Sequence, residues 1–228
     1  MKNVRDLIYM IALVVAFALT GCISDRGELG SEKNPIKFYF TPSQDAKALD
    51  DNSKVLKTYL EANTPYKFHM TVPQSYNAVV ESFGTKRADV AAINTFGYLT
   101  ANSKYGVEAK LITVRHGKST YQSQFLAKAN SGIQKIEDLQ GKKVAFVDPS
   151  STSGYLLPMK ALKEKKIILK DEVYAYKHDA VVSMIYQGQV DAGATFYSPP
   201  HEGKMEDARR LVLTQYPDVE EKIKIIHL

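Results

Sequence analysis

The chain has 228 residues, of which 44% are apolar and 24% are charged. It can therefore bury a hydrophobic core, and we expect a folded protein of one or two domains. Lysine and arginine total 30 against 25 acidic residues, a net charge of +5, and the basic residues form no long run, which argues against a nucleic-acid-binding arm. The single cysteine excludes an intrachain disulfide and a zinc site built from cysteine pairs.

The first residues have the pattern of an export signal. Two basic side chains precede an apolar stretch over residues 7–19. A helix of about 13 residues spans only about 20 Å, too short for the roughly 30 Å hydrocarbon core of a bilayer. Leu19-Thr20-Gly21-Cys22 resembles a bacterial lipobox, which implies that residues 1–21 are a signal peptide and that Cys22 is the lipid attachment site. The alternative is an ordinary signal peptide in which the cysteine is incidental.

Residues 22–35 are polar, include two glycines and show no hydrophobic period. We expect a flexible tether that holds the folded part outside the cytoplasmic membrane, in the periplasm or at the cell surface. ATP and nicotinamide cofactors are scarce there, and the sequence contains neither GxGxxG nor GxxxxGK[ST]. We therefore expect no cofactor.

From residue 36 onward, short β-branched or aromatic runs alternate with helical patterns. Residues 45–61 and 75–83 have the spacing of helices. The alternation predicts an α/β fold with parallel strands. The predicted strands are residues 36–40, 66–72, 89–93, 109–114, 124–127, 144–147, 173–176 and 190–194.

In open α/β sheets, ligands bind beyond the carboxyl ends of the strands, where loops lead into helices. In this chain those loops are rich in serine, threonine, tyrosine and asparagine, with hardly a lysine or arginine. Such a set of side chains suits an oxyanion held by neutral hydrogen bonds, or a sugar. The loops are residues 41–44, 73–76, 94–98, 148–155, 177–179 and 195–199.

The strongest motif lies in residues 146–158, which lead from a predicted strand into a helix. The first N–H groups of a helix have no internal acceptor, and the helix dipole favours an anion there. Ser151, Thr152 and Ser153 add hydroxyl donors, and we expect Gly154 to let a ligand approach the backbone. Pro158 is tolerated only near a helix start, which places that start at residues 151–154. The alternative, a single capping hydroxyl beside solvated ones, explains only one of these side chains.

Residues 151–158, STSGYLLP, and the upstream segment 132–146 resemble the PhnD-like binding proteins of ABC importers for phosphonate, phosphite and phosphate. This resemblance implies the type II periplasmic-binding-protein fold, in which two α/β lobes enclose the ligand. It implies a first lobe over residues 36–115, a second over 116–215 and a return crossover over 216–228.

The resemblance also implies a set of ligand-binding residues. The helix start contributes hydroxyls, a loop before the second helix and the crossover each contribute a tyrosine, and a strand-to-helix loop contributes a histidine whose charge is adjustable near neutral pH. Ser43, at the start of the first helix, is a weaker candidate from the opposite lobe. The matching residues are Ser151, Thr152, Ser153, Tyr76, Tyr121 and His178.

Two departures from the family pattern stand out. Relatives that bind aminophosphonates place a carboxylate at a position that falls at or near Ser198. Without that acid a buried ammonium group is costly, so we expect phosphate, phosphite or a small alkylphosphonate, although Glu202 is a nearby substitute. Family members also usually continue with an I-P-x-D-P segment and further helices, so we expect the first lobe to be incomplete and to expose apolar surface.

We therefore expect a monomeric, non-enzymatic lipoprotein that delivers a phosphorus oxyanion to an ABC permease and its ATPase. A hydrolase built on Ser151, His178 and Asp179 is disfavoured, because no GxSxG motif is present and adjacent histidine and aspartate rarely orient each other. No HExxH motif or paired histidines suggest a metal. A third interpretation keeps the fold and changes the ligand to a sulfonate, nitrate or a thiamine precursor.

Overall fold

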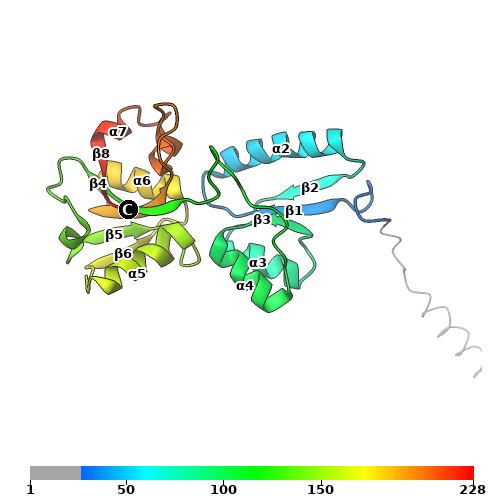
Figure 1. Cartoon of the computed structure of the whole chain (residues 1–228), viewed down its shortest axis with the longest axis horizontal. Coiled ribbons are helices and arrows are strands. Elements are labelled where there is room, and N and C mark those ends of the chain that lie inside the picture. The colour runs from blue at the N-terminus through cyan, green and yellow to red at the C-terminus, as the bar shows by residue number, and fades with distance from the viewer. Residues whose placement is uncertain (1–26) are drawn as a thin grey trace, which may run out of the picture.

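The chain folds into two lobes that lie side by side, each built on its own β-sheet (Figure 1). The computed structural model describes residues 27–228, so the predicted signal peptide and the predicted lipid attachment site, Cys22, lie outside the described residues. Within the described part, none of the helices has the length and apolar character needed to cross a membrane. The α/β class predicted from the sequence is confirmed.

The first lobe contains a three-stranded parallel sheet in the order β2-β1-β3. Helix α2 lies on one face of this sheet, and α3 and α4 lie on the other (Figure 1). Along the chain, each of the three strands leads through a short loop into one of these helices. The elements are β1 (Ile36–Phe40), α2 (Ala46–Asn63), β2 (Phe68–Thr71), α3 (Tyr76–Gly84), β3 (Val90–Ala92) and α4 (Thr95–Tyr105).

The second lobe contains a five-stranded mixed sheet in the order β6-β5-β7-β4-β8. Helices α5 and α6 cover its opposite faces (Figure 1), and each face has its own apolar core. The strands are β4 (Gln122–Lys128), β5 (Lys143–Phe146), β6 (Asp171–Tyr174), β7 (Ala192–Tyr197) and β8 (Ile223–His227). The helices are η1 (Ile136–Leu139), η2 (Thr152–Leu156), α5 (Leu157–Glu164), α6 (His178–Gln187), η3 (Ala208–Val212) and α7 (Val219–Lys222).

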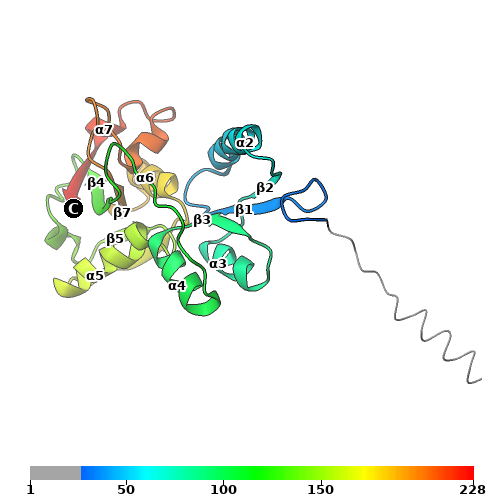
Figure 2. The ribbon, with the colours of Figure 1, turned by 45° about the vertical axis from the view of Figure 1, so that its right-hand side comes forward.

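The expectation that all strands are parallel is wrong for the second lobe. Strand β4 pairs antiparallel with both β7 and β8, whereas β5 is parallel to β6 and β7. The helical crossovers β5-α5-β6 and β6-α6-β7 require parallel strands. Strand β4 instead follows the connection from the first lobe (Figure 2), and no crossover helix fixes its direction.

The strand predicted over residues 109–114 is not formed. Leu111 is 95% exposed and Ile112 is 70% exposed, and among the described residues no strand pairs with this segment. A β-branched run needs a partner strand to satisfy its backbone groups. Residues 109–114 therefore have the composition of a β-strand, but they do not form one.

The described C-terminal part of the segment expected to be a tether, residues 22–35, has regular turns. Residues 28–34 form a tight turn closed by a bridge between Ser31 and Asn34. The Gly30 carbonyl accepts a hydrogen bond of 2.7 Å from the Lys67 amide, which fixes this turn to the chain just before β2. Gly30 has a φ of +89°, and the Tyr66 ring occupies the space that a side chain would need.

A buried ion pair ties η3 to β8 in the second lobe. Asp207 is 2% exposed and its carboxylate accepts hydrogen bonds from the Arg209 guanidinium at 2.7 and 3.0 Å. The same guanidinium donates to the Ile223 carbonyl at 2.8 Å. Removing one member of a buried pair leaves an uncompensated charge, which is more destabilising than replacing both members.

We therefore expect Arg209→Met to lower the free energy of unfolding by about 3–5 kcal/mol. The double variant with Asp207→Asn should recover much of that loss, because asparagine keeps the oxygen that accepts from the Arg209 backbone N–H and carries no charge. Urea denaturation of the two variants and the wild-type protein measures both effects. Equal losses in the single and double variants would contradict this account of the pair.

Candidate ligand-binding site

The helix predicted to bind an anion begins after Ser151, as expected from the sequence. The Ser151 hydroxyl accepts a hydrogen bond of 3.1 Å from the Gly154 N–H, so Ser151 is the N-cap. The first turn, η2, is a π-helix that runs directly into α5. Proline has no N–H, and its ring excludes the carbonyl four residues earlier. Pro158 therefore leaves the Gly154 carbonyl free, and Val147 N–H donates to it at 3.1 Å.

The wide first turn leaves backbone donors at the start of the helix. Within the described residues, the N–H groups of Thr152 and Ser153 have no protein acceptor. These groups carry the positive end of the helix dipole, and Ser153 and Ser151 are only 3% and 2% exposed. A partly enclosed pair of free N–H groups of this kind binds an anionic oxygen well.

Gly154 has a different role from the one expected. A Cβ atom at this position would lie 2.3 Å from Cγ2 of Val147, so the missing side chain makes room for the strand-side core and not for a ligand. The expectation of a close ligand approach at Gly154 is therefore wrong. The glycine instead lets the helix start pack tightly against the residue that follows β5.

The first lobe contacts this helix start directly. Asn94, the N-cap residue of α4, donates from its side-chain nitrogen to the Ser150 carbonyl at 2.8 Å and to the Thr152 hydroxyl oxygen at 3.1 Å. The Phe96 backbone N–H donates to the same hydroxyl oxygen at 3.0 Å. Asn77, in the first turn of α3, accepts a hydrogen bond of 3.0 Å from the Ser150 hydroxyl. The N-termini of α3 and α4 therefore meet the N-terminus of η2 across the lobes.

Tyr76 is buried in this interface. It is 4% exposed and packs with the apolar core of the second lobe. The Ser151 side chain lies near its hydroxyl, but the hydroxyl makes no hydrogen bond of good geometry to any described residue. Burial is the main cause that raises the pKa of Tyr76 well above its usual value; nearby Ser151 opposes this shift, and the negative charge of Asp148 adds to it. The phenol is therefore a protonated donor at physiological pH, and an unpaired buried donor of this kind is expected where a ligand binds.

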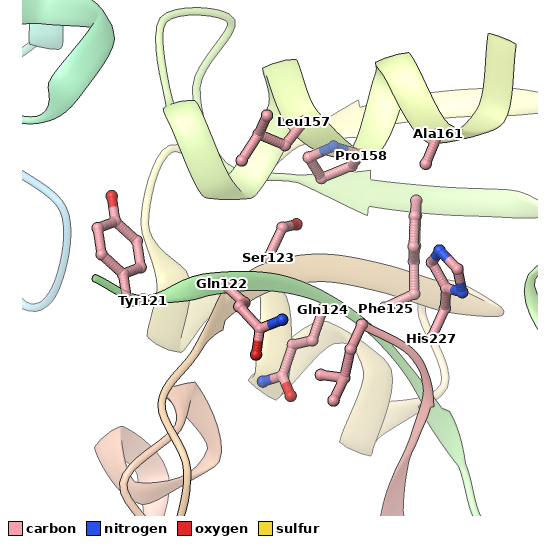
Figure 3. A pocket seen from close by; sticks show the side chains of 10 residues that line it. Tyr121, Gln122, Ser123, Gln124, Phe125, Leu157, Pro158, Ala161 and His227 are labelled. Atoms are coloured by element: carbon pink, nitrogen blue, oxygen red, sulfur yellow. The ribbon is translucent and has the colours of Figure 1, made fainter. Parts of the chain in front are cut away.

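Tyr121 precedes β4 and lies on the same side of the chain as Ser123 (Figure 3). The Ser123 hydroxyl donates to the Ser153 carbonyl at 2.7 Å. Partial burial raises the pKa of Tyr121, and nearby Ser153 opposes the shift. Beside these residues a pocket of about 290 Å³ lies between β4 and the start of α5, with Leu157 and Pro158 among its lining residues (Figure 3).

His178 begins α6 and contacts the first lobe through its backbone. Its N–H donates to the Ser43 carbonyl at 2.9 Å, so this contact uses the Ser43 backbone and not its hydroxyl. The ring is 6% exposed and packs edge-on against Phe196 at 5.0 Å. Burial lowers the pKa of His178 to about 3, and its Nδ1 atom has no hydrogen-bond partner among residues 27–228. The imidazole is therefore a neutral group at physiological pH.

The predicted residues gather at one edge of the second-lobe sheet. Strands β5 and β6 are parallel neighbours, so the residues that follow them, η2 and His178, lie at the same carboxyl edge. Ser151, Thr152, Ser153, Tyr76 and Tyr121 form one cluster. Ser43 and His178 meet at the neighbouring contact.

Sequence reasoning missed Asn77, Asn94 and Ser150. Asn94 lies in a loop that the sequence already placed at a carboxyl strand end, but its contacts to Ser150 and Thr152 join residues 56 and 58 positions apart. No local pattern identifies such a contact. Within the described residues, no group of three or more histidine, cysteine, aspartate or glutamate side chains is arranged to hold a metal ion.

The depressed pKa of His178 predicts a pH-dependent stability. The imidazole is charged in the unfolded chain below about pH 6.5 and stays neutral in the folded protein down to about pH 3. Its contribution is therefore fully present above about pH 6.5 and is lost as the pH falls. We expect the unfolding free energy of the wild-type protein to fall between pH 6 and pH 4 more steeply than that of His178→Gln, by about 1 kcal/mol per pH unit.

Urea denaturation at several pH values measures this difference. His69→Gln is the matched control, because His69 is exposed on β2 and its replacement should leave the slope unchanged. Parallel slopes for the wild-type protein and His178→Gln would show that the buried ring does not resist protonation.

Comparison with known proteins places these observations in a family. The family model described as "ABC transporter, phosphonate, periplasmic substrate-binding protein" matches residues 38–227. The chain is 31% identical over 169 residues to the "Phosphate-import protein PhnD" of Mycolicibacterium smegmatis, covering 68% of this chain and 53% of that protein. It is 27% identical over 187 residues to the "Probable ABC transporter phosphite binding protein PhnD1" of Prochlorococcus marinus, covering 72% and 59%.

Solved structures show the same fold. A binding protein component of an ABC phosphonate transporter from Pseudomonas aeruginosa has a TM-score of 0.71 at 19% identity, covering 84% of this chain and 64% of that one. PhnD1 from Prochlorococcus marinus in complex with methylphosphonate has a TM-score of 0.68 at 19% identity, covering 84% and 71%. Of the two curated relatives named above, the chain spans little more than half the length. It belongs to the family of periplasmic substrate-binding proteins of ABC phosphonate transporters.

Proposed function

We propose that this chain captures a small phosphorus oxyanion between its two lobes and presents it to an ABC permease. The observation that carries this proposal is the set of unpaired donors at one corner: the free N–H groups of Thr152 and Ser153 and the buried hydroxyl of Tyr76. An anionic oxygen satisfies all three, and hydrogen bonds from neutral donors to an ion are stronger than those to a neutral acceptor.

In the proposed site, neutral hydrogen-bond donors bind the negatively charged ligand. Its donors are hydroxyls, backbone amides and a neutral imidazole, while the carboxylate of Asp148 is occupied at 2.7 Å by the Ser150 N–H. Burial strengthens such hydrogen bonds because the local dielectric constant is low. Neutral donors compensate an oxyanion without requiring a salt bridge, and they distinguish ligands by the number and placement of oxygens.

We infer phosphate, phosphite or a small alkylphosphonate as the ligand. The curated relatives are named for phosphate import and phosphite binding, and a solved neighbour contains methylphosphonate. Glu202, the candidate partner for a ligand amine, has a 79% exposed side chain and pairs with His201 at 3.8 Å. These contacts support a site in which no carboxylate pairs with a ligand amine.

The contacts of the catalytic-type residues support binding and not hydrolysis. Among the described residues, no imidazole accepts from the Ser151 hydroxyl, which accepts from the Gly154 N–H as the N-cap, and the Nδ1 atom of His178 has no carboxylate partner. One oxygen of Asp179, Oδ1, is buried and unpaired, and the Nδ1 atom of His178 is unpaired as well, so these two atoms do not pair with each other. A nucleophile, a base and an orienting acid in mutual hydrogen-bond contact are what a serine hydrolase requires.

The setting that we propose follows the family description, which is periplasmic. We propose that Cys22 carries a lipid anchor, that the binding protein acts as a monomer, and that an ABC permease and its ATPase are its partners. We retain residues 36–115 as the first lobe, 116–215 as the second and 216–228 as the return crossover. The exposure of Leu111 and Ile112 supports the proposal that the first lobe presents apolar surface to a further contact.

A titration panel tests the ligand class. We expect isothermal titration calorimetry to show binding of phosphate, phosphite or methylphosphonate, and much weaker binding of aminoethylphosphonate. Taurine, nitrate and thiamine test the alternative in which the fold is kept and the ligand differs. Binding of those compounds, with none of the phosphorus oxyanions, would overturn the proposal.

Tyr76→Phe tests the role of the unpaired hydroxyl. Because that hydroxyl has no partner in the protein, its removal should leave the free energy of unfolding unchanged or slightly raised. It should nevertheless weaken binding of the oxyanion by about tenfold, equivalent to about 1.4 kcal/mol. Calorimetric titration and thermal unfolding of the same samples measure the two effects. Tyr59→Phe, on the exposed face of α2, is the control, and equal affinities for all three proteins would exclude a ligand contact at Tyr76.

A further inference from the structure

Two asparagines of the first lobe contact the same short segment, Ser150 to Thr152, with opposite hydrogen-bond roles. Asn94 acts as a donor, to the Ser150 carbonyl and to the Thr152 hydroxyl oxygen. Asn77 acts as an acceptor, from the Ser150 hydroxyl. A carbonyl oxygen can only accept, so the 2.8 Å contact to Ser150 fixes which end of the Asn94 amide faces the second lobe.

The Thr152 hydroxyl accepts two hydrogen bonds and can therefore only donate to a further partner. A hydroxyl group has one proton to donate and two lone pairs that accept. Both lone pairs of Thr152 are used, by the Asn94 side chain at 3.1 Å and by the Phe96 N–H at 3.0 Å. Its proton is therefore the only part of the group that is left to contact a further partner.

The neighbouring Ser150 has the reverse arrangement. Its hydroxyl proton is given to the Asn77 side-chain oxygen at 3.0 Å, so Ser150 is not available as a donor to a ligand. The two asparagines thus assign different roles to two hydroxyls that lie two positions apart. An independent sign that a ligand belongs beside them is the buried Tyr76 hydroxyl, which has no protein partner.

We propose that Asn94 is a specificity-determining residue of the ligand site. By occupying one lone pair of Thr152 from the opposite lobe, beside the Phe96 N–H that occupies the other, it commits that hydroxyl to donating its proton to an unprotonated ligand oxygen. A ligand that presents a P–O–H group or an ammonium at this point finds no acceptor. This inference rests on the proposed function and adds to it the residue that fixes the direction of one hydrogen bond.

The test compares Asn94→Asp with Asn77→Asp. Both substitutions add one negative charge near a helix N-terminus, where acidic residues are favoured. An aspartate at position 94 cannot donate, so it would accept the Thr152 proton and reverse the role of that hydroxyl. An aspartate at position 77 keeps the oxygen that accepts from Ser150. The pair therefore separates the effect of hydrogen-bond direction from the effect of charge.

We expect Asn94→Asp to weaken binding of methylphosphonate and phosphate at pH 7.5 by about 30-fold or more, and Asn77→Asp by less than about fivefold. The deficit of Asn94→Asp relative to the wild-type protein should shrink as the pH is lowered toward 4, because a protonated carboxyl group can again donate. Calorimetric titration across this pH range measures both. Asn94→Ser, which replaces the long amide donor with a shorter hydroxyl and adds no charge at a position where serine is favoured, should lose about tenfold.

The outcomes are distinguishable from those that test the function itself. Equal losses in Asn94→Asp and Asn77→Asp, or unchanged affinity in Asn94→Ser, would overturn the role of Asn94 while leaving the oxyanion site in place. If Asn94→Asp does not fold by circular dichroism, Asn94→Ser and Asn77→Asp decide the question. A folded wild-type protein that binds none of the phosphorus oxyanions overturns the proposed function, and this inference with it.

Discussion

Backbone N–H groups that cannot be satisfied within their own helix are the constraint on which the arrangement of this protein depends. Pro158 prevents normal α-helical bonding to the residue four positions earlier, so the helix begins with the wide turn η2. That turn leaves the N–H groups of Thr152 and Ser153 without acceptors in the described protein. Burying such groups without a partner is unfavourable, and the first lobe contacts the same segment through the Ser150 carbonyl and the Thr152 hydroxyl.

The α/β topology brings several helix starts to the same place. Parallel strands end at one edge of each sheet, and the helices that follow begin there. The N-termini of α3 and α4 in the first lobe meet that of η2 in the second, and the region preceding α2 meets the first residue of α6. The dipoles of these helices all contribute positive potential. Such helix N-termini can attract an anion without the side chain of a lysine or arginine. The buried His178 ring, which is neutral, likewise adds no charge there.

Much of the site was predictable because it follows from local rules. The Ser151 cap, the start of the helix ahead of Pro158 and the position of His178 after a strand depend on residues within a few positions of each other. The contacts of Asn94 and Asn77 depend on how the lobes pack, and they join residues 56 to 73 positions apart. The same limit explains the two errors in the fold. Residues 109–114 have the composition of a strand but no partner, and the direction of β4 is set by sheet pairing.

The Thr152 hydroxyl takes part in the contact between the lobes, because both groups that donate hydrogen bonds to it come from the opposite lobe. By the inference above, it also donates a hydrogen bond to the ligand. Under the proposed function, contact between the lobes and ligand binding therefore share one set of atoms, and their free energies are thermodynamically linked. On that proposal, a sequence change that strengthens the contact between Asn94 and Thr152 also opposes separation of the lobes and release of the ligand. For such a carrier, the best affinity is an intermediate one, since retention and release draw on the same hydrogen bonds.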